Sequence, residues 1–62
     1  MKTGMLVSVW RSRKILHFCP GVTDDTVGML ISDAIQDPHR GWRVDVMFLG
    51  VAVSDVHVSE VK

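Results

Sequence analysis

The chain has 62 residues, 47% of them hydrophobic, and its seven lysines and arginines balance seven acidic residues. A chain this short forms one domain and buries only about 60% of the surface its unfolded form exposes, so we expect marginal stability. The balanced charge excludes the broad positive field that drives nonspecific binding to nucleic acid or anionic membranes.

A single cysteine excludes an intramolecular disulfide, and no cysteines and histidines stand at zinc-site spacing. Small domains usually need a disulfide or a bound metal for stability, so we expect oligomerisation or a partner protein to supply the missing stabilisation. The apolar runs are too short to cross a bilayer, and the first residues lack a signal-peptide core. A lone free cysteine fits a reducing compartment. These features predict a soluble cytoplasmic protein, an independent small gene product without a membrane partner.

Two β-rich stretches open the chain. Residues 5–10 (MLVSVW) and 15–19 (ILHFC) flank the polar segment 11–14 (RSRK). Branched and aromatic residues on both sides of a polar turn are typical of a hairpin, so the sequence predicts two antiparallel strands here.

Next along the chain, the sequence predicts a helix from Thr23 to Gln36. Thr23 can cap its first turn, and the two aspartates that follow suit the positive end of the helix dipole. Apolar residues then recur at helical spacing, at Val27, Leu30, Ile31, Ala34 and Ile35. Pro38 ends the helix. Gly28 is its weak point, but the missing side chain would allow a close approach to a neighbouring strand.

After the helix, residues 42–49 alternate between two faces and predict a half-buried strand. Gly50 permits a turn. In the last stretch, 51–61, the valines change parity, which a bulge near Ser54–Asp55 would explain.

Together these elements predict an α+β fold in the order strand, strand, helix, strand, strand, with one small sheet of three to four strands crossed by the helix. The sheet face under the helix would take Val7, Val9, Leu16, Phe18, Trp42, Val44, Val46, Phe48, Val56 and Val58. The opposite face is too apolar for an ordinary solvated face. We expect its residues Leu6, Trp10, Ile15, Met47 and Leu49 to contact another protein. Alternatively, a curled sheet or a different strand parity would make these residues core.

The segments Asp24-Asp25-Thr26-Val27, Ile35-Gln36-Asp37 and Val46-Met47-Phe48-Leu49-Gly50 resemble the helix start, helix end and following strand of ubiquitin-like β-grasp proteins. The resemblance covers about residues 5–50 and implies recognition through the sheet face opposite the helix. The chain lacks the di-glycine tail that conjugation requires. A second, purely architectural resemblance is to small phage-encoded inhibitors of host enzymes, which would make this a viral-type inhibitor or adaptor.

Chemistry is not expected. His17 and Cys19 would share a strand face, with His57 possible nearby, but a nucleophile or catalytic metal needs an oxyanion site or a supporting shell that the chain does not indicate. We therefore predict no catalytic residues, no cofactor and no metal site.

The sequence thus predicts a non-catalytic protein–protein interaction module that acts by steric binding and forms a homo-oligomer. The alternative is a small dimeric nucleic-acid-binding regulator. Its contacts would be the basic residues Arg11, Arg13, Lys14, Arg40 and Arg43.

Overall fold

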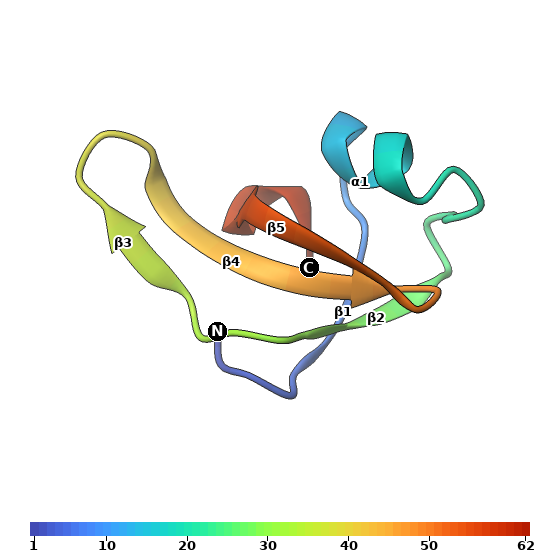
Figure 1. Ribbon diagram of the computed structural model, residues 1–62, viewed down its shortest axis with the longest axis horizontal. Coiled ribbons are helices and arrows are strands. Elements are labelled where there is room, and N and C mark those ends of the chain that lie inside the picture. Colours follow the sequence, from blue (N-terminus) through green and yellow to red (C-terminus); the bar gives the residue numbers. More distant parts are fainter.

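The computed structural model describes residues 1–62 and consists mainly of antiparallel strands (Figure 1). The elements are β1 (Leu6–Ser8), α1 (Arg13–Phe18), β2 (Val27–Leu30), β3 (Ile35–Asp37), β4 (Gly41–Phe48), β5 (Val51–His57) and the 3₁₀ helix η1 (Val58–Glu60). Strands hold 44% of the residues and helices 15%. The predicted α+β fold, a sheet crossed by one helix, is therefore wrong, and the protein is mostly a curled antiparallel sheet.

The central strand is β4. Val46 pairs with Leu30 of β2 and with Val53 of β5, so these two strands lie on opposite edges of β4. By the same reasoning Arg43, which pairs with both β3 and β5, places β3 on the same edge as β2. β2 and β3 therefore follow each other along one edge of the long curved β4 ribbon (Figure 1).

The path from β2 to β3 bends because the intervening residues do not pair regularly. The Ile31 amide donates to the Asp45 carbonyl at 3.0 Å, and the Asp45 amide donates to the Ser32 hydroxyl at 2.9 Å. A side chain thus replaces the backbone partner at the bend, which keeps the Asp45 amide satisfied.

The C-terminal residues close the other side of the sheet. Val61 bridges Val9, and Ser8 and Lys62 exchange two backbone hydrogen bonds of 2.8 and 2.9 Å. β1 is therefore flanked by β2 on one edge and by the chain end on the other, so the sheet curls into a half-barrel.

The core fills this half-barrel. Its twelve buried hydrophobic residues are Val7, Val9, Ile15, Cys19, Val22, Leu30, Val44, Val46, Phe48, Val53, Val56 and Val61. Alternation along β4 turns its even-numbered residues inward from Val44 onward. Trp42 shares this parity but is 48% exposed, so its predicted place in the core is wrong.

The helix predicted from Thr23 to Gln36 is also wrong. Residues 23–26 form a turn, in which the Thr26 amide donates to the Thr23 carbonyl and the Thr23 amide donates to the Thr26 hydroxyl at 2.9 Å. Short polar side chains offer the backbone such a local alternative to a helix start. Pairing with β1 and β4 then places Val27 and Leu30 in β2 and Ile35 in β3, while Ile31 and Ala34 lie between the two strands.

The first predicted hairpin fails at its second strand. Residues 13–18 form α1, because the hydroxyl of Ser12 accepts from the Ile15 amide at 3.0 Å and caps the helix. Ile15 is fully buried, so its predicted exposure on an interaction face is wrong, whereas Leu16 and Phe18, predicted as core, are about half exposed. α1 packs against β5 near the end of the sheet (Figure 1).

Three predictions for the second half of the chain are confirmed. β4 matches the alternating strand at 42–49, and Gly50 forms the turn to β5 with a φ of 77°. Between the pairs Val44–Val56 and Val46–Val53, two residues of β5 face one residue of β4, so the bulge lies at Ser54–Asp55.

Candidate functional site: the outer face of the sheet

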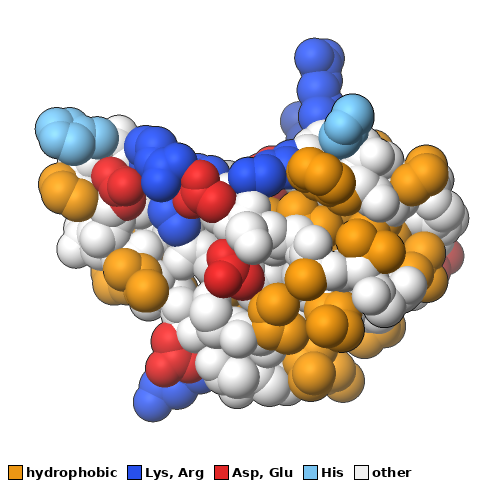
Figure 2. Space-filling model, viewed as in Figure 1, with side chains coloured by type: hydrophobic (Ala, Val, Ile, Leu, Met, Phe, Trp, Pro, Cys, Tyr) orange, Lys and Arg blue, Asp and Glu red, His pale blue; other side chains and the backbone are white.

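The outer face of the half-barrel has two halves of different chemistry. Arg43, Asp45 and Met47 point outward from β4, alternating with its buried residues. Figure 2 shows charged side chains gathered on the left of the face in view, and hydrophobic ones over the right, where β2 and the β4–β5 turn lie in Figure 1. We call these the ionic half-face and the apolar half-face. The apolar half-face consists of Leu6, Val27, Met29, Met47, Leu49 and Ala52.

The centre of the apolar half-face is a row of side chains in register across four strands. Leu6 pairs with Met29, Met29 with Met47, and Met47 with Ala52. The exposed fractions are 70% for Leu6, 42% for Met29 and 36% for Met47. Paired residues of neighbouring strands share a face, so these side chains form one continuous apolar surface without a charge.

Leu49 extends this surface at the tip of the β4–β5 hairpin. It has a φ of 52° and is followed by Gly50 with a φ of 77°, the pattern of a type I′ turn. The left-handed conformation costs a residue with a Cβ about 1–2 kcal/mol. Its side chain is nevertheless 62% exposed, with Cδ1 lying beside Gly21. Burial in the protein's own core therefore does not explain a leucine here.

The structure brings together three of the five predicted contact residues, Leu6, Met47 and Leu49. Trp10 is 51% exposed but lies beyond the end of β1, where the Lys62 ammonium stands 4.3 Å from its ring centroid. The fifth, Ile15, is core. Sequence reasoning missed Val27 and Met29, because it placed them in a helix; the alternation of exposed and buried residues over 27–30 is the signal that could have found them.

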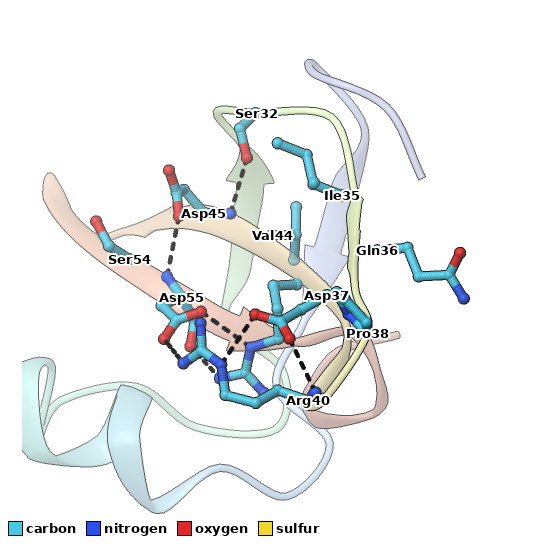
Figure 3. A pocket seen from close by; sticks show the side chains of 11 residues that line it. Ser32, Ile35, Gln36, Asp37, Pro38, Arg40, Val44, Asp45, Ser54 and Asp55 are labelled. Carbon is cyan, nitrogen blue, oxygen red and sulfur yellow. Dashed lines mark hydrogen bonds and ion pairs between the residues drawn. The ribbon is translucent and has the colours of Figure 1, made fainter.

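The ionic half-face centres on Asp55. Its carboxylate accepts from Arg43 Nε at 3.0 Å and from Arg40 Nη1, and its carbonyl accepts from Lys14 Nζ at 3.0 Å. Arg40 Nε also pairs with Asp37 at 3.2 Å. Figure 3 shows the side chains of Asp37, Arg40 and Asp55 converging at an open cavity. The cavity has a volume of about 390 Å³ and lies between the β3–β4 loop and β5.

The β5 bulge positions Asp55 for these contacts. Asp55 has a φ of 61°, a conformation that aspartate tolerates better than most residues. Its amide donates to Asp45 Oδ1 at 2.9 Å, which fixes the bulge (Figure 3). The cluster therefore acts as a clamp that ties the β3–β4 loop to β5.

This clamp predicts a loss of stability in acid. The hydrogen bond from Arg40, and to a smaller extent the one from Arg43, lowers the pKa of Asp55. The hydrogen bond from the His39 amide lowers the pKa of Asp37. Thr3 lowers the pKa of Asp33 in the same way. A carboxylate whose pKa is lower in the folded state than in the unfolded state stabilises the fold at a pH above its unfolded pKa, which is about 3.9 for aspartate. This contribution disappears as the pH falls through the folded-state pKa.

We expect the urea midpoint to fall between about pH 4 and pH 2, and the fall to be smaller for Asp55→Asn. Urea unfolding of both proteins across this range checks the prediction. Equal acid sensitivity in the two proteins would show that Asp55 is not a principal titrating group.

Three of the five predicted nucleic-acid contacts converge on Asp55. Arg40 and Arg43 pair with its carboxylate and are partly neutralised, whereas Lys14 donates to its backbone carbonyl. Arg11 lies 5.4 Å from the centroid of Trp10, and Arg13 is exposed at the start of α1. The basic residues therefore do not form one free positive surface.

The residues considered for chemistry are separated. His17 lies on α1, so it does not share a strand face with Cys19, which is buried with its thiol 3.5 Å from the Phe48 carbonyl. His57 caps η1, its Nδ1 accepting from the Ser59 amide at 3.1 Å. No three side chains of the metal-binding types come together.

Neither a family model, nor a curated protein, nor a solved structure matches this chain. None of its helices has the length and apolar character needed to cross a membrane.

Proposed function

We propose that this protein is a non-catalytic protein–protein interaction module whose apolar half-face packs against an apolar protein surface. The observation that carries the proposal is the uncharged row Leu6, Met29, Met47 and Ala52, in register across four strands and open to solvent. Contiguous apolar patches bordered by polar residues mark interaction sites.

The gain from covering this surface is substantial. Removing apolar area from water contributes about 25 cal/mol per Å², and Leu6, Met29 and Met47 still expose 70%, 42% and 36% of their surface to be covered. The row lies on paired strands, so little backbone order is lost on binding. Binding here would act sterically, by occupying the partner's surface.

The ionic half-face adjoins the row along β4 and defines its limit. Arg43 and Asp45 stand on the same outer side of the strand as Met47, at successive outward positions. An interface with an apolar centre and a polar rim has this arrangement. The partner's matching surface is therefore uncharged over the row, because a charge buried there would find no counter-ion.

The test compares Met47→Lys with Ile35→Lys. Both place a lysine at an exposed apolar position, but Ile35 is 69% exposed on β3, beside the ionic half-face. We expect a partner protein to be retained by the immobilised wild type and by immobilised Ile35→Lys, but not by immobilised Met47→Lys. The purified partner is expected to bind Met47→Lys at least tenfold more weakly than it binds the wild type, a loss of about 1.4 kcal/mol in binding free energy. Circular dichroism checks that both variants fold. Unchanged retention by Met47→Lys would overturn the proposal.

The proposal also predicts that the protein does not bind nucleic acid appreciably. A fluorescent duplex oligonucleotide is expected to remain free at roughly 150 mM salt, because Asp55 and Asp37 partly neutralise the strongest basic cluster. Binding that weakens steeply with rising salt would instead support the nucleic-acid-binding alternative.

A further inference from the structure

We propose that the occupant of the apolar half-face is a second copy of this chain, paired about a twofold axis, with Leu49 as an anchor of the contact. This inference rests on the proposed function, since it names the partner of the same surface. Three observations carry it: the charge distribution of the outer face, the size of the apolar half-face and the conformation of Leu49.

The charge distribution makes the surface compatible with itself. A twofold contact places the same patch on both subunits, so every charge near the axis meets a like charge. The apolar half-face contains no charged residue, and the cluster around Asp55 lies at the other end of β4. Two copies can therefore cover each other's Met29 and Met47 while both ionic half-faces stay in water.

The size of the surface sets the strength of the pair. Four adjacent strands span only about 14 Å at about 4.8 Å per spacing. Stable complexes bury about 800 Å² on each partner, which would be roughly a fifth of the 4121 Å² that this molecule exposes. The apolar half-face is smaller than that. The pair therefore falls in the transient class below about 1,200 Å² of total buried area, and we expect association only at micromolar or higher concentration.

Leu49 points to a role outside the fold. A type I′ turn favours asparagine before glycine, and Asn-Gly at 49–50 would satisfy the turn without the strain of a leucine. The leucine side chain is 62% exposed at the tip of the β4–β5 hairpin, two residues after Met47. Backbone strain retained at an exposed position is a recognised mark of functional sites. A second copy would cover this side chain.

The decisive variant is Leu49→Asn, because folding and association are expected to change in opposite directions. The melting temperature is expected to rise, as the turn is relieved. The dimer dissociation constant is expected to rise at least tenfold, since a covered leucine is replaced by a polar residue. Sedimentation equilibrium of the wild type and the variant, from micromolar to millimolar protein, measures the second effect.

Two threonine variants provide the matched control. Leu6→Thr removes a 70% exposed aliphatic side chain from the apolar half-face, and Ile35→Thr removes a 69% exposed one from outside it. We expect weakened association for Leu6→Thr and wild-type association for Ile35→Thr.

A wild type that stays monomeric to millimolar concentration would overturn this inference, as would Leu49→Asn associating like the wild type. If the wild type is monomeric but a foreign protein is still lost on Met47→Lys, the proposed function stands and only the identity of the occupant is wrong.

Discussion

Replacing Gly28 with alanine is expected to destabilise the protein by about 3 kcal/mol or more. A Cβ at this position would lie 2.5 Å from the Met47 carbonyl oxygen and 2.6 Å from two ring carbons of Phe48. Neither can retreat easily, because the carbonyl belongs to the central strand and Phe48 is fully buried. Thermal or urea unfolding of purified Gly28→Ala measures the effect.

Gly21→Ala is the matched control. A Cβ there would meet only Leu49 Cδ1, at an ordinary contact distance of 3.5 Å, so a change within about 0.5 kcal/mol is expected. If Gly28→Ala were as stable as Gly21→Ala, β2 and β4 could not pack as closely as the structure shows.

Phe48→Ala is expected to cost about 3–5 kcal/mol, because it empties the space of the largest fully buried side chain. Domains of this size have only a few kcal/mol to lose, so we expect the variant to be largely unfolded at room temperature. Near-ultraviolet circular dichroism and amide dispersion in an NMR spectrum report the loss.

The two positions are expected to interact. In Gly28→Ala combined with Phe48→Leu, the smaller side chain leaves room for the new methyl group, so the double variant should lose less stability than the sum of the two single changes. The relief is partial, because the Met47 carbonyl still lies too close. Strict additivity would contradict contact between Gly28 and Phe48.

The second half of the fold could be predicted from sequence because its signals are local. Alternation along β4, the glycine at the turn and the parity change of the valines each depend on neighbouring residues alone. The bulge at Ser54–Asp55 could therefore be predicted from the sequence without knowing which strand pairs with it. The close approach at Gly28 was also anticipated, although within a helix rather than a strand.

The first half could not be predicted because distant contacts decide it. The polar residues 23–25 suit a helix cap and a tight turn equally well, and pairing with β4 selects the turn and strand. In residues 13–18, capping by Ser12 and the burial of Ile15 override β propensity, and Ser12 is itself held by Glu60, 48 positions away. No local pattern contains that contact.

The candidate site divides in the same way. Leu6 and Met47 lie on strands that the sequence indicated, so their exposure could be anticipated. Met29 joins them into one row, but its place in the sheet could not be anticipated, because the sequence analysis assigned it to a helix. The clamp on Asp55 could not be predicted from the sequence either, because its side chains come from α1, β5 and the β3–β4 region, which are far apart along the chain.

The most direct test of the central claim is a dilution series of methyl NMR spectra, from millimolar to micromolar protein. We expect concentration-dependent shifts at the methyl groups of Leu6, Val27, Met29, Met47 and Leu49, and none at Ile35 beside the ionic half-face. Spectra that do not change with concentration, or shifts centred on Ile35, would contradict the assignment of the apolar half-face as the surface through which this protein pairs.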